Sequence, residues 1–351
     1  MIARAALSPR QVDDMLGTPP TPANARGAED GKRSMTTATA RHVDPRTLVS
    51  PDELIRLRRR STAWGLAMIA SAWAMIAAAI LLVAWTPHPA LWLVTVPLAM
   101  AVIGSRQLGL AILMHEGAHG GLSSKPSLNL WLSQWLCAYP VFTDTLAYRE
   151  YHFRHHAHAQ TGRDPDLHLS AKFPVTRASL RRKLWRDITG RTGLQQRRAQ
   201  LRAGMGEPTW PVSQRLRHFG QRLARQVAVN AVLWGGMTAA GVWWAYPLLW
   251  LVPMLTWYQL VTRVRNIAEH SLLDVDGDPL RVARTTHAGW IERLFFAPYW
   301  VNYHAEHHLI MYVPCYRLPA LHRAMARSGM VERLVVDTGY RPVLAAAARA
   351  G

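Results

Sequence analysis

Histidines are concentrated in three short motifs of this chain, at spacings that could hold metal ions. The motifs are His115-Glu116-Gly117-Ala118-His119, His152-Phe153-Arg154-His155-His156 and His304-Ala305-Glu306-His307-His308. Residues three and four positions apart share a face of a helix, so each motif can aim two or three imidazoles at one point. Neutral imidazole is a preferred ligand of iron, zinc and copper. One HxxxH pair often arises by chance, but three motifs placed between apolar segments predict a metal site.

The first histidine motif follows two apolar segments that are expected to cross a membrane. Trp64 to Trp85 carries no charge and is long enough to span about 30 Å of hydrocarbon. After a turn at residues 86–89, a helix from Ala90 to His119 would cross the bilayer and protrude from it. The protruding end would carry the first motif, and the glycines that follow it would end the helix.

A second uncharged stretch, Val227 to Leu260, is too long for one comfortable span. It is expected to form a pair of helices that turns at Tyr246-Pro247. The sequence therefore predicts an all-α integral membrane protein, with a cytoplasmic helical cap that carries the histidine motifs. Four transmembrane helices are expected, at about residues 64–85, 90–114, 227–245 and 247–264.

The charge of the chain indicates how it lies in that membrane. The 351 residues carry a formal net charge of +19, and arginines flank the apolar segments. This is the pattern of the positive-inside rule, so no nucleic-acid partner is expected. The rule places both termini and all three motifs on the cytoplasmic side of a bacterial inner membrane. The strongly basic residues 148–225 either face lipid headgroups or form a docking surface for an acidic redox protein or acyl carrier.

Composition also divides the chain into regions. Residues 1–49 lack apolar periodicity and are expected to be disordered. One domain is expected over residues 50–340, opening on a helix capped by Ser50. Residues 341–351 are expected to form a C-terminal tail.

Two further features of the domain bear on its fold. Residues 128–142 are apolar but short, which favours an interfacial or re-entrant segment over a span. The two cysteines, Cys137 and Cys315, are too few to hold an iron–sulfur cluster. They are expected to pack as small apolar side chains.

The order and spacing of the motifs between apolar segments resemble those of the membrane fatty acid desaturases, over about residues 64–321. That family has an additional Asn-x-x-x-His between its second and third motifs, and Asn266-Ile267-Ala268-Glu269-His270 matches it. The resemblance implies that nine histidines hold two iron ions and that Asn266 holds a metal-bound water. The first motif is HxxxH instead of HxxxxH, a variation that the family tolerates. The implied metal ligands are His115, His119, His152, His155, His156, His270, His304, His307 and His308.

Several carboxylates and histidines near this ligand set have roles that the sequence indicates less clearly. Glu116 and Glu306 are expected either to orient imidazole N–H groups or to be solvated charges. Asp164-Pro165-Asp166 is a turn signal that could also supply such carboxylates. The remaining histidines near the motifs are expected to be partly exposed and not to bind metal, so His322→Ala should change little. These are His158, His168, His287 and His322.

The chemistry that this resemblance implies is the insertion of a C=C bond into an acyl chain. The substrate would be a fatty acid, or an acyl-lipid, acyl-CoA or acyl-ACP. Breaking an unactivated C–H bond requires an oxidant made from O₂, and zinc has no redox chemistry, so iron is expected. The chain has no GxGxxG fingerprint and too few cysteines for a cluster. A separate electron donor such as a ferredoxin or rubredoxin is therefore expected.

Two other functions remain open. Fatty acid hydroxylases and a decarboxylase that makes terminal alkenes use the same architecture, and motif spacing does not encode which product forms. A metal-binding membrane protein without catalysis is the alternative of another class. A transporter would need ionisable residues inside its spans, and Trp64–Trp85 and Val227–Leu260 contain no charged residue or histidine.

Overall fold

The computed structural model describes residues 43–275 and 277–349, and this part of the chain is mostly helical. The α-helices are α2 (Pro51–Leu57), α3 (Thr62–Ala84), α4 (Trp92–Ala118), α5 (Pro126–Trp131), α6 (Thr145–His158), α7 (Leu167–Ser170), α8 (Arg177–Ile188), α9 (Arg191–Met205), α10 (Val212–Ala239), α11 (Val252–Leu255), α12 (Trp257–His270), α13 (Trp290–Phe295), α14 (His304–Leu309), α15 (Leu318–Arg327) and α16 (Tyr340–Ala346). The π-helices are η4 (Leu132–Ala138) and η6 (Tyr246–Leu251). The 3₁₀-helices are η2 (Pro45–Thr47), η3 (Pro89–Leu91), η5 (Tyr139–Val141), η7 (Pro279–Arg281), η8 (Pro298–Trp300), η9 (Cys315–Arg317) and η10 (Val331–Arg333). The strands are β1 (Val175–Thr176), β2 (Arg284–Thr286), β3 (Val335–Asp337) and β4 (Ala348–Arg349).

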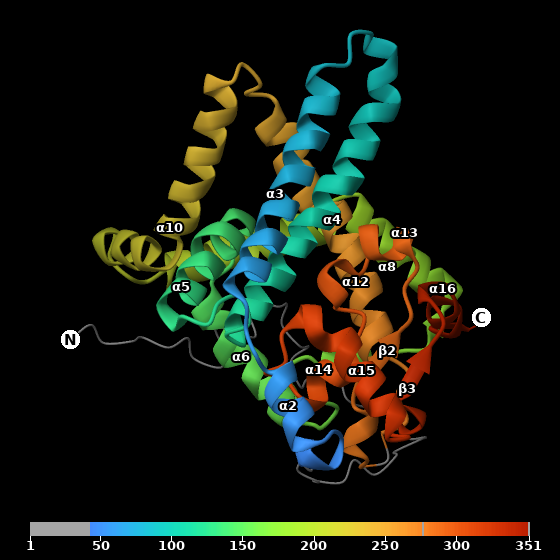
Figure 1. Cartoon of the computed structure of the whole chain (residues 1–351). Coiled ribbons are helices and arrows are strands. Elements are labelled where there is room, and N and C mark those ends of the chain that lie inside the picture. The colour runs from blue at the N-terminus through green and yellow to red at the C-terminus, as the bar shows by residue number, and fades with distance from the viewer. Residues whose placement is uncertain (1–42, 276, 350–351) are drawn as a thin grey trace, which may run out of the picture.

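Helices α3 and α4 form a long hairpin that projects from the body of the molecule (Figure 1). Ser61 caps α3, because its side chain accepts a hydrogen bond from the Trp64 backbone N–H. Helix α4 continues past the hairpin into the body and ends at Ala118, where Gly120 takes a positive φ of 78°. Among the described residues, these are the two helices that are long and apolar enough to cross a membrane. The expectation that the second apolar helix continues as far as the first motif is confirmed, whereas its crossing of a membrane stays a prediction.

A second hairpin projects on the same side of the molecule in Figure 1, but its two limbs differ from the expected spans. Helix α10 ends at Ala239, several residues before the expected turn, and its first half carries four arginines. The return limb is broken into η6, α11 and α12, with a kink at Thr256. Pro247 and Pro253 lack the backbone N–H that a continuous helix needs, which accounts for the interruption. The prediction of two regular spans over residues 227–264 is therefore not confirmed.

Buried polar and aromatic contacts join the hairpins to the body. The Asn230 side chain on α10 donates to the Tyr139 carbonyl and accepts from the Tyr246 hydroxyl and the Trp250 indole. Trp250 in turn stacks on Trp73 of α3, with ring centroids 5.6 Å apart. The buried side chain of Gln107 on α4 donates to the Trp250 carbonyl at 2.7 Å. These contacts hold η6 against α3, α4 and α10. The chain continues from η6 through α11 into α12, and both α4 and α12 carry site residues at their ends.

The apolar segment at residues 128–142 is divided among the short helices α5, η4 and η5, and it is not among the helices long enough to span. Cys137 within it and Cys315 are both buried and unpaired, as expected of small packing residues.

The two ends of the described chain depart from the sequence-based regions. Residues 43–49 were expected to be disordered, yet Leu48 and Val49 are buried. Residues 1–42 lie outside the described residues. The expected C-terminal tail instead folds onto the body: Val343 of α16 is buried and β4 pairs in parallel with β1. A second parallel pair, β2 with β3, holds the preceding segment. Apolar side chains at both ends are buried against the body, so the domain extends beyond the predicted limits.

Candidate metal centre

Four helices bring the histidine motifs to one place in the body of the molecule. The first motif lies at the end of α4, and the second lies on α6, which begins at Thr145 behind an Asp144 cap. His270 is the last residue of α12, and the third motif forms the short helix α14. In Figure 1 these ends meet below the two hairpins, on the side away from their tips.

The nine candidate ligands form two groups, and within each group the ligand atoms lie within 4.8 Å of one another. The first motif, His152, His156 and His307 make up a group of five. His155, His270, His304 and His308 make up a group of four. The groups adjoin where the rings of His156 and His308 stack, with centroids 4.3 Å apart. The second and third motifs thus each divide their histidines between both groups.

The ring nitrogens approach one another at distances that suit shared metal ions. His156 Nε2 lies 2.9 Å from His152 Nε2 and 3.1 Å from His307 Nε2. In the other group, His304 Nε2 lies 2.8 Å from His270 Nε2. Nitrogens bound about 2.1 Å from one ion, at tetrahedral or octahedral angles, are about 3.0–3.4 Å apart. The arrangement of Nε2 atoms therefore fits one transition-metal ion in each group.

Contacts on the opposite ring nitrogens orient several of these imidazoles. His155 Nδ1 lies 2.8 Å from Asp164 Oδ1, and His270 Nδ1 lies 3.2 Å from the Val282 carbonyl oxygen. His152 Nδ1 lies 3.3 Å from the Tyr148 hydroxyl. A partner on Nδ1 fixes the ring and leaves Nε2 for a metal. The carboxylate role suggested for the Asp164-Pro165-Asp166 turn is thus confirmed for Asp164.

The protonation of the cluster also suits metal binding. Burial, with the neighbouring imidazoles, holds the pKa of His152, His304 and His307 well below the ordinary histidine value. Burial likewise lowers the pKa of His270 to about 3. For His155, burial acts to lower the pKa, but the hydrogen bond and charge of Asp164 outweigh it and raise the pKa. Neutral imidazoles present the lone pairs that a metal requires. His155 is the exception among these, because its raised pKa favours the protonated form.

The two glutamates within the motifs do not contact the ligand imidazoles as one interpretation expected. Glu116 Oε1 accepts from the backbone N–H of Cys315 at 3.2 Å. Glu306 is fully buried on the far side of α14, where it accepts from the Thr285 hydroxyl and lies 2.5 Å from His322 Nδ1. Residues two apart on a helix point in different directions, so Glu306 cannot face the metal side together with His304 and His308. Both carboxylates anchor the motifs to the surrounding structure instead.

The structure revises the expectation for His322. The sequence suggested that His322 is not a metal ligand, and neither histidine group includes it. Its Nδ1 does, however, contact the buried carboxylate of Glu306. His322→Ala should lower the free energy of unfolding by about 1–3 kcal/mol, because a buried carboxylate loses a hydrogen-bond partner. Thermal unfolding of the purified protein measures this. The matched control is His168→Ala, an exposed histidine whose Nδ1 forms a hydrogen bond with the carbonyl of Pro165. Equal unfolding midpoints for the two variants would contradict the anchoring role.

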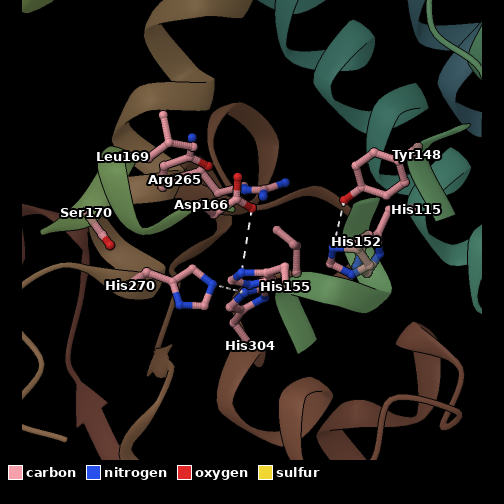
Figure 2. A pocket seen from close by; sticks show the side chains of 12 residues that line it. His115, Tyr148, His152, His155, Asp166, Leu169, Ser170, Arg265, His270 and His304 are labelled. Carbon is pink, nitrogen blue, oxygen red and sulfur yellow. Dashed lines mark hydrogen bonds and ion pairs between the residues drawn. The ribbon is translucent and has the colours of Figure 1, made fainter. Parts of the chain in front are cut away.

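A cavity of about 40 Å³ reaches both histidine groups (Figure 2). His115 and His152 line it from the first group, and three histidines of the second group line it from the other side. Asn266 also lines this cavity. That its amide holds a metal-bound water, as the resemblance implies, stays a prediction.

Comparison with known proteins decides the family. A family model described as fatty acid desaturase matches residues 90–336, more than half of the chain. The chain belongs to the fatty acid desaturase family. Within it, the chain is similar to dihydrorhizobitoxine desaturase of Bradyrhizobium elkanii. The two are 28% identical over 306 residues, which cover 82% of this chain and 80% of that protein.

Sequence reasoning missed several residues that surround the centre of this family member. Glu269 is buried, and its carboxylate lies 3.6 Å from His304 Nε2 and 3.0 Å from Arg265 Nε. Arg284 donates to the carbonyls of Ala268 and Ser271 at the end of α12, and pairs with Asp337 of β3. Only the adjacency of Glu269 to His270 was visible beforehand, because the other contacts join distant parts of the chain.

Proposed function

We propose that this protein is an O₂-dependent desaturase that holds two iron ions and inserts a C=C bond into an acyl chain. The observation that carries the proposal is the division of nine histidines into two metal-sized groups that share one cavity. When bound there, iron supplies the reduction of O₂ and the removal of hydrogen from unactivated C–H bonds. Overall, a CH₂–CH₂ unit, one O₂, two electrons and two protons give a CH=CH unit and two waters.

The protein's own residues have defined tasks in this proposal. Asp164, Tyr148 and the Val282 carbonyl hold three imidazoles with Nε2 directed inward. Glu306 fixes α14 to β2 and α15 from behind. Asn266 holds water in the cavity between the groups. Ligands that are held rigidly before the metal binds can impose one coordination geometry on it and exclude water from the site.

The electrons would come from a separate donor such as a ferredoxin or rubredoxin. Two exposed basic helices, α8 and α9, support either of the two roles proposed for this region, contact with lipid headgroups or with an acidic protein. Hydroxylation or decarboxylation of the same substrates is the alternative outcome at the same site. The relative is named for a desaturation, which favours desaturation here.

We infer that the chain crosses the inner membrane four times, with the metal centre on the cytoplasmic side. The two hairpins project in one direction in Figure 1, and basic residues lie at their bases. Cysteines placed at the hairpin tips, His88→Cys and Ala240→Cys, should react with a membrane-impermeant maleimide on intact cells, whereas Arg181→Cys should react only after lysis. The native cysteines are buried and give a low background. Labelling of Arg181→Cys on intact cells would contradict the orientation, and protection of Ala240→Cys would contradict the second hairpin's crossing.

The proposed activity is tested by the products that form in cells. Cells that express the protein with a ferredoxin and its reductase are compared with cells that express His307→Ala. Mass spectrometry of acyl chains and headspace volatiles should show unsaturated products in the cells with the native protein and none in the cells with His307→Ala. A second candidate substrate, dihydrorhizobitoxine, is supplied to both cultures because the relative is named for it. Hydroxylated acids or terminal alkenes would show that the protein is a hydroxylase or a decarboxylase instead of a desaturase. Identical product profiles in the two cultures would contradict an oxidative function.

A further inference from the structure

The cavity between the two histidine groups is polar beyond the histidines themselves. Its wall includes Tyr148, Asp166, Ser170, Arg265 and Asn266, beside two apolar residues, Leu169 and Val301. Figure 2 shows the Arg265 and Asp166 side chains directed toward the cavity above His155. A methylene chain offers no partner to any of these groups. Polar groups that an apolar chain removes from water without a partner cost free energy, so this wall suits a polar part of the substrate.

Arg265 is the most informative residue in that wall. It lies on α12, one residue before Asn266 and five before His270. Its side chain is 20% exposed, and its Nε pairs with Glu269 at 3.0 Å. A guanidinium has five N–H donors. Arg265 Nε is buried and has no hydrogen-bond partner among the described residues, although it forms the ion pair with Glu269.

The carboxylates nearby have partners of different kinds. Glu269 forms an ion pair with Arg265 Nε, although neither of its oxygens has a hydrogen-bond partner among the described residues. Asp166 accepts from the Tyr151 hydroxyl and lies 3.7 Å from His155 Nδ1. A guanidinium with free terminal N–H groups presents a fork that matches a carboxylate in a bidentate pair. If the histidine groups hold metal ions, an anion that enters the cavity would meet positive charge from them as well as from Arg265.

We propose that Arg265 binds a free carboxylate of the substrate, so that the C–H bonds oxidised lie close to that carboxyl group. This rests on the proposed function, because it assumes that the substrate's reacting carbons lie beside the two histidine groups. The assignment selects among the acyl carriers. A free acid offers the anion that Arg265 requires, whereas a thioester or a lipid ester has lost it.

The test uses the full-length protein loaded with Co²⁺, whose visible absorption reports on ligands near the metal. Butyrate is the probe, and butyramide is its neutral counterpart of nearly the same shape. Butyrate should shift the absorption of the native protein, and butyramide should bind at least about 10-fold more weakly. Arg265→Gln should retain Co²⁺ and bind butyrate on the order of 10- to 100-fold more weakly, since a charge-assisted pair is lost.

Two further variants sharpen the result. Arg265→Lys keeps the charge but not the fork, so its butyrate affinity should fall between those of the native protein and Arg265→Gln. Arg181→Gln, an exposed arginine on α8, removes one charge elsewhere and should bind butyrate like the native protein. Native affinity for butyrate in Arg265→Gln would overturn the proposal, because the carboxylate would then bind the metals directly. Equal binding of butyramide would overturn it as well.

The cobalt content distinguishes a failure of the carboxylate assignment from a failure of the proposed function. Two Co²⁺ per chain, with no preference for butyrate, would leave the proposed function standing and remove the carboxylate assignment. A native protein that binds no Co²⁺ would contradict the proposed function and, with it, the inference that rests on it.

Discussion

His307→Ala should abolish product formation and lower the iron content of the purified protein. His307 lies at the centre of the five-histidine group, with its ring centroid 4.6 Å from that of His115, 4.7 Å from that of His119 and 4.9 Å from that of His156. Its Nε2 is 3.1 Å from His156 Nε2, so its removal leaves a gap in the ligand sphere. It also joins the third motif to the first two, which no other member of that group does. Product analysis together with iron analysis measures both effects.

The matched control for His307→Ala is His287→Ala, because His287 is exposed and belongs to neither histidine group. This control should keep native iron content and activity. If His307→Ala retained both, the assignment of the five-histidine group as a metal site would be wrong. If the control lost iron as well, the loss would reflect general damage to the fold.

Asp164→Ala should weaken iron binding by about 10- to 100-fold, the usual cost of removing a partner that orients a metal-bound histidine. Asp164 is buried, and its Oδ1 holds His155 Nδ1 at 2.8 Å. The carboxylate also accepts from the backbone N–H groups of Gln160 and Asp166, so it fixes the turn that follows α6. The measurement is iron retention during titration with a chelator, monitored alongside activity.

Two further variants serve as comparisons for Asp164→Ala. Asp164→Asn keeps an oxygen that can accept from His155 and should recover part of the affinity. Asp274→Ala removes an exposed carboxylate from a loop and should behave as the native protein. An Asp164→Ala protein that retains iron as firmly as the native protein would show that His155 needs no orienting partner.

The nine candidate ligands could be predicted because the signal that marks them is local. Spacings of three and four residues fix which imidazoles share a helix face, whatever the tertiary structure. The structure brings all nine predicted histidines together, including His270, which the resemblance alone added. What spacing could not encode is the division of each HxxHH motif between two groups. That division depends on how α6 and α14 are placed relative to one another, which tertiary packing sets.

The partners of the ligands were harder to predict because they come from distant segments. Glu306 is adjacent to His307 in sequence, yet its contacts are Thr285 on β2 and His322 on α15. Asp164, nine residues from His155, is the carboxylate that reaches that ring. Proximity in sequence favoured the wrong glutamates, since a residue on the opposite helix face points away from the site.

The fold was predictable where one helix carries the whole apolar signal, as in α3 and α4. The second hairpin was not, because hydropathy reports composition and does not report where prolines interrupt the hydrogen-bond ladder. The return limb therefore appears as η6, α11 and α12, where one helix was expected. The C-terminal segment was misjudged for a related reason. Its few apolar residues, such as Val343, become informative only once a partner surface exists.

The most direct test of the central claim is the metal content of the native protein, purified from iron-supplied cells and measured with a Mössbauer spectrum. The two histidine groups predict about two iron ions per chain, in two nitrogen-rich environments. A single iron per chain, or zinc in place of iron at full occupancy, would contradict the two-iron centre on which the proposed function rests.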